Sequence, residues 1–196
     1  MTTSLWSSTA TRDWREALAS YEDVIAAQGV ARLPELDRWY RDELSTALPE
    51  RRSMHVTHAE LVRLTEWKMA RGVWRAPNLV LVRSNPPQDV IDASTLALSK
   101  VPHPTAPIAA LAKLKGVGPA TASAVTAAAA PHTYPFFDEL VAEQVPELGK
   151  VAWTLGYYAR YAEALRQRAS ALGGEWTPVM VERAAWAWRG GKTGTS

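Results

Sequence analysis

The stretch that decides the fold is residues 111–125, LAKLKGVGPATASAV, in which a Gly-Val-Gly turn separates two segments of helical character. Gly116 and Gly118 bracket Val117, and glycine reaches positive φ and allows close backbone approach without steric cost. Pro119 suits the first position of a helix, where its missing N–H would have no partner. The amides of the turn and the positive end of the second helix dipole therefore point at one place, which is suited to binding a phosphate.

This element resembles the helix-hairpin-helix of the DNA glycosylase superfamily, in particular the endonuclease III type, whose hairpin has the form L-P-G-[VI]-G. The corresponding residues here are 114–118, LKGVG. The resemblance implies binding of double-stranded DNA, with a monovalent cation held at the hairpin in some members. The residues expected at this DNA contact are Lys113, Lys115, Gly116, Val117, Gly118, Ala120 and Thr121. A plain tight turn between two helices is the alternative interpretation.

A carboxylate follows the hairpin at a spacing similar to that of the glycosylases. Asp138 lies 18 residues beyond Ala120, which occupies the position of a lysine found in a subset of the family. The apolar stretch 134–137 comes directly before Asp138, so we expect this carboxylate at the mouth of a cleft. Two alternatives remain open. Asp138 serves only as a helix N-cap, because aspartate readily accepts backbone N–H bonds there, or a one-residue shift makes Glu139 the cleft carboxylate.

The resemblance also implies a chemistry. In a glycosylase, a flipped nucleotide enters the cleft, and Asp138 would stabilise the oxocarbenium-like charge on the sugar or orient a water for attack. Alanine at position 120 cannot form the Schiff base of the bifunctional members, so we expect a monofunctional glycosylase unless Lys113, Lys115 or another lysine substitutes. The alternatives are a helix-hairpin-helix DNA-binding protein without catalysis and a helical protein-binding domain.

The composition narrows the class of protein. The chain of 196 residues is 47% hydrophobic, enough for one core or for one core shared by two lobes. The formal net charge is +2, and residues 150–192 carry seven Lys and Arg against three Glu, a modest bias toward a polyanionic partner. Cysteine is absent, which excludes the four-cysteine iron-sulfur loop of many endonuclease III relatives. The histidines form no metal-binding pattern, so we expect no metal and no other cofactor apart from the hairpin cation.

The sequence also bears on localisation. No signal-peptide pattern follows Met1, and no apolar run approaches the length needed to span a membrane. We therefore expect a cytoplasmic protein, in contact with the nucleoid or placed in the nucleus, that is monomeric and does not bind membranes.

Apolar residues recur at three- and four-residue steps along most of the chain, so an all-α fold is predicted. Thr57 and Glu60 form a capping-box pattern at the start of one helix. Residues 79–82 are the only strand-like segment and are equally compatible with a buried helical turn. About nine or ten helices are expected, including residues 12–27, 33–48, 58–72, 87–98, 108–114, 119–130, 138–145, 151–172 and 178–188.

The predicted helices divide into two lobes around a cleft, as in the family that the hairpin resembles. Lobe 1 spans about residues 50–145 and contains the helix-hairpin-helix at 105–130. Lobe 2 combines residues 1–49 with 146–190, and residues 190–196 are expected to be a flexible tail of this single domain.

Several side chains outside the hairpin are weaker candidates for DNA contact. Lys68, Arg71 and Arg75 follow at steps of three and four, which places three cations on one helical ridge, either solvated or in contact with phosphates. Trp74 is the candidate for stacking on a base. Trp14, Trp39, Trp67 and Trp153 lie on apolar stripes and are expected in the core, and one of Trp186 and Trp188 is expected to be exposed or docked on the other lobe.

Overall fold

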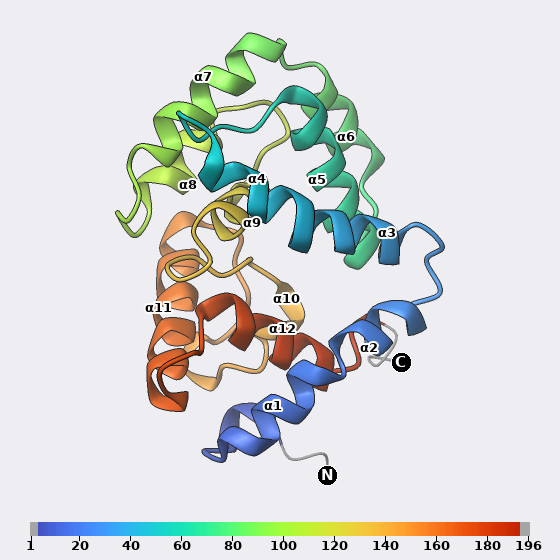
Figure 1. Cartoon of the computed structure of the whole chain (residues 1–196), viewed down its shortest axis with the longest axis vertical. Coiled ribbons are helices and arrows are strands. Elements are labelled where there is room, and N and C mark those ends of the chain that lie inside the picture. The colour runs from blue at the N-terminus through green and yellow to red at the C-terminus, as the bar shows by residue number, and fades with distance from the viewer. Residues whose placement is uncertain (1–3, 193–196) are drawn as a thin grey trace.

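The structure, a computed structural model, describes residues 4–192, and every regular element in this part of the chain is helical (Figure 1). The prediction of an all-α fold is confirmed. Residues 79–82 lie within a helix, and residues 193–196 of the predicted tail lie outside the described residues. The α-helices are α1 (Thr11–Ala19), α2 (Tyr21–Ala27), α3 (Leu33–Arg38), α4 (Ser45–Glu50), α5 (His58–Arg71), α6 (Ala76–Arg83), α7 (Pro87–Leu98), α8 (Ala106–Leu111), α9 (Pro119–Ala129), α10 (Glu139–Ala142), α11 (Leu155–Leu172) and α12 (Pro178–Trp188).

Shorter helical turns complete the architecture. Leu5–Ser7 and Pro146–Leu148 are 3-10 turns, and Trp39–Leu44 is a π-helical segment between α3 and α4. The predicted helix at 12–27 is interrupted at Ser20, which separates α1 from α2. The capping box that opens α5 is present as predicted, because Thr57 accepts from the Glu60 amide and Glu60 accepts from the Thr57 amide.

Two groups of helices are stacked along the long axis of the molecule (Figure 1). The upper group contains α3 to α9, and the lower group contains α1, α2 and α10 to α12. The segment at 33–50, which the sequence led us to place with the terminal helices, instead contacts α5 and α9. The Tyr40 hydroxyl donates a hydrogen bond of 2.7 Å to the Ala124 carbonyl in α9, which fixes this contact.

Helix α9, the second helix of the hairpin motif, lies in the interior. All of its residues from Thr121 to Ala129 are buried. Alanine side chains are short, so α5, α8 and the segment around α4 approach the α9 backbone closely. The helix that begins at the hairpin is therefore held on several sides, and its N-terminus has a fixed position.

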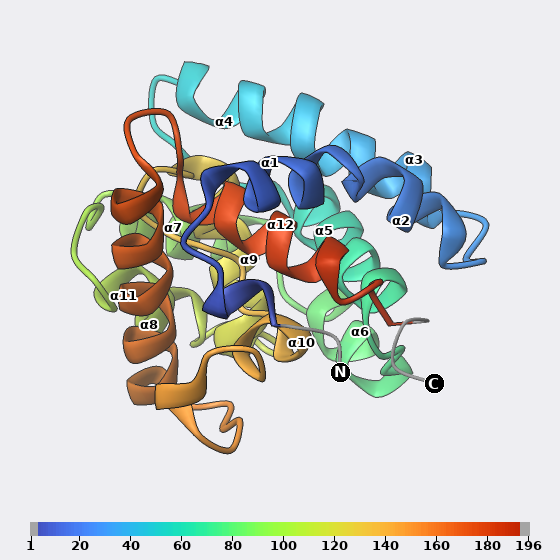
Figure 2. The ribbon, with the colours of Figure 1, turned by 90° about the horizontal axis from the view of Figure 1, so that it is seen from below.

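Helix α12 is the centre of the lower group. Figure 2 shows α1 running alongside α12, and α11 packs on it from another side. Trp186 is fully buried, with its ring centroid 5.5 Å from that of Tyr21 in α2, whereas Trp188 is 42% exposed, so one of the two tryptophans is exposed as expected. Among the described residues, no helix combines the length and the apolar character that crossing a membrane requires.

Candidate functional site

The two glycines of the hairpin have different structural roles. Gly116 has φ of +73°, and a Cβ there would lie 2.7 Å from the carbonyl oxygen of Asn78 and 2.9 Å from the Val82 nitrogen in α6. Gly118 has φ of −96° and no atom within 4 Å of the position that a Cβ would take. Gly116 is therefore required by packing, whereas Gly118 leaves an open backbone surface at the start of α9.

Asn85 fixes the hairpin from a distance of thirty residues in sequence. Its side-chain nitrogen donates to the Lys115 carbonyl and its side-chain oxygen accepts from the Lys115 amide, both at 2.9 Å. The N-cap of α7 is Pro86, so the Asn85 side chain serves the hairpin and does not cap this helix. The Lys113 and Lys115 side chains are exposed, while Val117 is 5% exposed and only its backbone can face a ligand.

A cavity of about 350 Å³ opens beside the hairpin. Its wall includes Gly118 to Thr121 at the start of α9, with Asp138 and Glu139 from the α10 region. Lys68 and Arg71 from α5 and Arg75 from the following loop lie on another side. The structure thus brings most of the residues singled out from the sequence to one cavity. The exceptions, which are not among its lining residues, are Trp74, Lys113, Lys115, Gly116 and Val117.

Asp138 is the N-cap of α10 and lines this cavity. Its Oδ1 accepts a hydrogen bond of 2.9 Å from the Leu140 amide, and the residue is 8% exposed. Glu139 is the first residue of the helix and is exposed at the cavity rim. The two open interpretations of Asp138, as a cap and as a cleft carboxylate, are therefore compatible in the same position.

The backbone that leads into Asp138 is held by three hydrogen bonds. The Ser123 hydroxyl in α9 accepts from the Phe137 amide at 2.8 Å. The hydroxyls of Tyr158 and Tyr161 in α11 donate to the carbonyls of Pro135 and Phe136 at 3.2 and 2.7 Å. Sequence reasoning missed these tyrosines, whose spacing of three residues on the buried face of α11 was their only signal.

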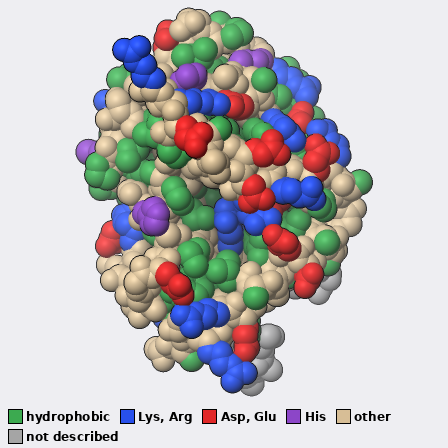
Figure 3. Space-filling model, viewed as in Figure 1, with side chains coloured by type: hydrophobic (Ala, Val, Ile, Leu, Met, Phe, Trp, Pro, Cys, Tyr) green, Lys and Arg blue, Asp and Glu red, His purple; other side chains and the backbone are tan. Residues whose placement is uncertain are grey.

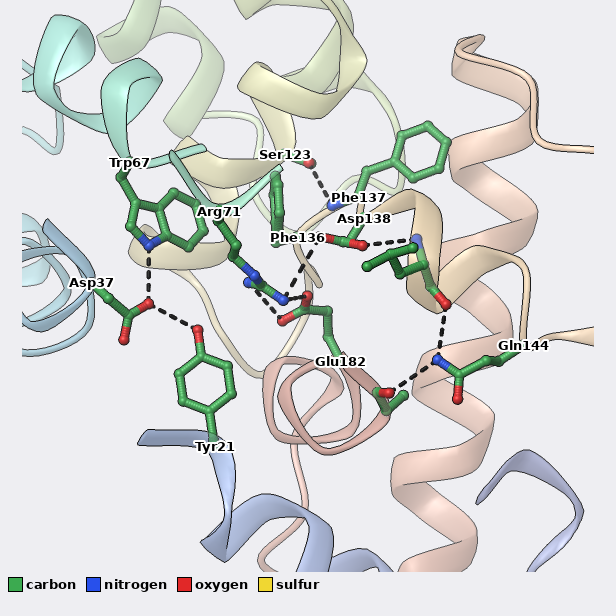
Figure 4. A network of polar contacts seen from close by, with 12 residues as sticks. Tyr21, Asp37, Trp67, Arg71, Ser123, Phe136, Phe137, Asp138, Gln144 and Glu182 are labelled. Atoms are coloured by element: carbon green, nitrogen blue, oxygen red, sulfur yellow. Dashed lines mark hydrogen bonds and ion pairs between the residues drawn. The ribbon is translucent and has the colours of Figure 1, made fainter. Parts of the chain in front are cut away.

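Arg71 is buried beside Asp138 and does not lie on an exposed ridge (Figure 4). It is 2% exposed and forms a short hydrogen-bonded ion pair with Glu182 of α12, while its Nη2 lies 3.8 Å from Asp138 Oδ2. The prediction that Arg71 is a surface cation is wrong, because its side chain is buried between the upper and lower groups of helices, where it pairs with Glu182. Glu182 was missed in the sequence, where it is the single carboxylate in α12.

The surroundings of Arg71 are aromatic. The guanidinium carbon lies 4.5 Å from the Trp186 ring centroid and 5.2 Å from that of Phe136. Arg71 Nε has no hydrogen-bond partner. Buried guanidinium groups gain from stacking on aromatic faces, which offsets part of their desolvation.

Burial dominates the ionisation of both carboxylates. It raises the pKa of Asp138, an effect opposed by Arg71 and by the amides of Leu140 and Val141. Burial likewise raises the pKa of Glu182 to about 7, again opposed by Arg71. Burial by itself would lower the pKa of Arg71, but the charge of Glu182 raises it above the usual value. Arg71 is therefore a permanent cation between two carboxyl groups that resist ionisation.

Two tryptophans near the site are exposed. Trp74 is 53% exposed in the loop after α5, which fits the expectation of a surface position. Trp153 is 46% exposed, so its predicted place in the core is wrong. Its ring lies against Phe137, with centroids 4.8 Å apart, and it lines the cavity. Trp153 belongs to the loop before α11 and not to a helix stripe, which explains the error.

Several surface cations away from the cavity are paired with carboxylates. Figure 3 shows acidic and basic side chains interspersed over α3 and α5 on one face. Arg32 and Arg83 both contact Glu66, and Arg63 contacts Glu35. Because these cations are paired with carboxylates, the basic groups that line the cavity are better candidates for contacts with phosphates. Within residues 4–192, no three His, Asp or Glu side chains are grouped as a metal site would require.

Comparisons of the chain with protein-family models, with curated proteins and with solved structures give no match. The function must therefore be argued from the site itself.

Proposed function

We propose that the protein binds double-stranded DNA and removes a damaged or mismatched base by hydrolysis, with Asp138 as the carboxylate at the reacting sugar. The observation that carries this proposal is that the start of α9 and Asp138 line the same cavity. A phosphate held by the open backbone at Gly118 would place the adjoining nucleotide next to this carboxylate.

The cavity has the properties that such a reaction needs. Its volume of about 350 Å³ lies within the range of about 300–1,000 Å³ that is typical of small-molecule sites. Trp153, which is 46% exposed and lines the cavity, supplies apolar surface against which a flipped base can stack. Asp138 must be ionised to stabilise positive charge on the sugar. Burial raises its pKa, and Arg71 together with the Leu140 amide opposes this rise and favours the ionised form. Ala120 also lines the cavity, and its methyl group cannot act as an amine nucleophile.

The hairpin can also accommodate the monovalent cation that the resemblance implies. Among residues 4–192, no hydrogen bond is donated to the carbonyl oxygens of Gly116 and Val117, which leaves two oxygen ligands of the kind that such cations prefer. Together with a DNA phosphate they would hold the cation, which would supply positive charge for the phosphate and take no part in bond cleavage.

A second candidate is a DNA-binding protein without catalysis. The observation in its favour is that Asp138 has two structural roles, as the N-cap of α10 and as an ion-pair partner of Arg71. In that case the hairpin alone would explain the DNA contact.

The decisive experiment incubates the protein with duplexes that each carry one damaged or mismatched base, followed by alkaline cleavage at abasic sites. We expect product from at least one duplex, its loss in Asp138→Asn and its retention in Glu139→Gln, the exposed neighbour at the cavity rim. Duplex binding without product from any lesion would favour the second candidate.

The hairpin is tested separately by Gly118→Ala. A methyl group at this position meets no protein atom within 4 Å, so we expect unchanged thermal stability and weaker duplex binding in a gel-shift assay. Gly174→Ala, which also meets no atom within 4 Å and lies between α11 and α12, is the matched control. Equal affinity of the two variants would exclude the backbone at Gly118 as the phosphate contact.

A further inference from the structure

Two carboxylates share the Arg71 guanidinium unequally (Figure 4). Glu182 forms a short hydrogen-bonded ion pair with Arg71 Nη2, and its second oxygen lies 3.5 Å from Nη1. Asp138 Oδ2 lies 3.8 Å from the same Nη2. Hydrogen bonds from N–H donors to oxygen span about 2.7–3.2 Å, so Arg71 acts on Asp138 through its charge and not through a hydrogen bond.

The guanidinium is held in this position from several sides. Four aromatic rings lie around its carbon atom, at centroid distances between 4.5 and 5.7 Å: those of Tyr21, Trp67, Phe136 and Trp186. The helices next to the two carboxylates are joined by Gln144, whose side-chain nitrogen donates to the carbonyls of Leu140 in α10 and Ala185 in α12 at 2.8 and 3.0 Å. The fold therefore fixes the cation and both carboxylates relative to one another.

This arrangement suits a carboxylate that must be ionised and also available to a substrate. Burial raises the pKa of Asp138, and Arg71 opposes that rise. A guanidinium in direct hydrogen-bonded contact with Asp138 would neutralise its charge, because the attraction between opposite charges strengthens as their separation falls. With Arg71 hydrogen-bonded to Glu182, Asp138 is stabilised in its ionised form by a cation that is paired elsewhere.

We propose that Glu182 is a positioning residue for base excision, which holds Arg71 away from Asp138 and so keeps the Asp138 carboxylate available to the cationic sugar. This inference rests on the proposed function, because Asp138 is the carboxylate of that reaction. Glu182 is 1% exposed and is not among the lining residues of the cavity, so it acts through Arg71 and does not contact the substrate.

The protonation state of Glu182 then controls the reaction. Burial raises the pKa of Glu182 to about 7, against the opposing charge of Arg71 and with a contribution from Asp138. Below this pH the protonated Glu182 attracts Arg71 less strongly, and Arg71 can pair with Asp138. Above it the ionised Glu182 withdraws Arg71, so the rate of excision should rise as pH passes through about 7.

Other charged and titratable groups also face this network. Arg183, next to Glu182 on α12, lowers the pKa of Glu182. Three buried tyrosines interact with the charge of Glu182, and burial raises the pKa of each: Tyr21, Tyr40 and Tyr161. Four charged residues share the cavity with Asp138: Lys68, Arg75, Glu139 and Lys192. The tyrosines and Arg183 keep one protonation state around neutral pH, and a variant of Glu182 separates its contribution from that of the cavity residues.

The test measures single-turnover base excision across pH on a duplex that yields product with the wild-type protein. We expect the wild-type rate to rise about tenfold between about pH 6 and about pH 8, as a carboxyl group with a pKa of about 7 ionises. Glu182→Gln keeps the shape of the side chain and one acceptor for Arg71. Its rate should be flat over this range and about tenfold below the wild-type rate at about pH 8, with unchanged duplex affinity in a gel-shift assay.

Asp37→Asn is the matched control, because Asp37 is also 1% exposed and accepts a hydrogen bond of 2.7 Å from an arginine, Arg41. This variant should keep the wild-type rise with pH, and thermal melting shows whether each variant is folded. Carboxyl NMR titration supplies a measurement that does not depend on excision. The pKa of Asp138, assigned with Asp138→Asn, should be at least about one pH unit lower in Glu182→Gln, because Arg71 is then its ion-pair partner.

A wild-type rate that does not rise through about pH 7, or a rise that persists in Glu182→Gln, overturns the role of Glu182. An Asp138 pKa that is equal in Glu182→Gln and in the wild-type protein overturns it as well. Absence of product from every duplex at every pH overturns the proposed function instead, and the Asp138 titration still decides whether Glu182 holds Arg71 away from Asp138.

Discussion

Asp37 and Asp138 are both buried aspartates, but their surroundings differ in kind. Asp37 is 1% exposed, and its two oxygens accept hydrogen bonds from Tyr21, Trp67 and Arg41 at 2.7 to 3.0 Å. Asp138 accepts a hydrogen bond of 2.9 Å from the Leu140 amide, and its Oδ2 lies 3.8 Å from Nη2 of Arg71. Asp138 also lines the cavity, whereas Asp37 does not.

The oxygens of Asp37 are occupied by donors within the fold, whereas Asp138 keeps an oxygen that can accept a hydrogen bond from a ligand. Three donors at short distances leave little capacity on Asp37 for another partner, so its burial is explained by its role in joining α2, α3 and α5. The hydrogen bond to Asp138 comes from its own helix, and its second oxygen keeps capacity for a ligand. Burial alone therefore does not identify a functional acid, and the set of donors around it must also be considered.

The largest effect is expected on the rate of base excision when Asp138 is replaced. Asp138→Asn removes the charge that would stabilise the sugar cation, so we expect base excision to fall by at least about 100-fold. Asparagine is also a good N-cap, so unfolding by urea should show a change of about 1 kcal/mol or less. A variant that loses stability and keeps its excision rate would place Asp138 in the same class as Asp37.

The next effect concerns the cation that stands beside Asp138. Glu182→Ala leaves Arg71 buried with Asp138 at 3.8 Å as its nearest carboxylate, and breaking a buried pair in this way costs about 3–5 kcal/mol. Urea unfolding measures the loss. Glu163→Ala, which breaks an exposed contact to Arg166, is the control and should cost about 1 kcal/mol or less. Equal losses in the two variants would contradict a structural role for the buried pair.

A smaller effect appears in the pH dependence of stability. The pKa of Glu182 is raised to about 7 in the folded protein from an ordinary value of 4.5, so the folded state binds its proton more tightly than the unfolded state. Stability should therefore fall as pH rises from about 4.5 to about 7, by at most about 3 kcal/mol from this group. Urea unfolding across this range should show the slope, and Glu182→Gln should flatten it. An unchanged slope would assign the dependence to other groups.

The smallest effect is expected when Asp37, whose oxygens already accept three hydrogen bonds, is replaced. Asp37→Asn cannot accept from all three donors at once, since one side-chain oxygen is replaced by an amide donor, and the mismatch should cost about 1–3 kcal/mol. The rate of base excision by the folded protein should not change. A loss of excision rate equal to that of Asp138→Asn would remove the distinction between the two aspartates.

Much of the fold and part of the site were predictable, because their causes are local. The capping box at Thr57 and Glu60, the proline that opens α9 and the Gly-Val-Gly turn act over a few residues of backbone. The spacing to Asp138 could be read from the chain, and the structure places this residue in the cavity beside the start of α9. Binding of DNA at the start of α9 and removal of a base with Asp138 remain predictions.

The errors share a different cause. Arg71 followed a pattern typical of a solvated ridge, and only the approach of α12 buries it against Glu182. Trp153 lay among apolar residues, yet its loop leaves it exposed at the cavity. The side chain of Asn85, which the sequence analysis did not single out, forms hydrogen bonds with the backbone of Lys115, thirty residues away.

The sequence by itself determined the helices, the hairpin and the position of the aspartate, because periodicity, capping and glycine conformation depend on neighbouring residues. The tertiary structure alone decided which charges are buried together, since Arg71, Asp138 and Glu182 come from three separate helical regions. It also decided that Lys68 lines the cavity, where burial lowers its pKa. Desolvation and ion pairing depend on what surrounds a group in space, and a linear pattern does not contain that information.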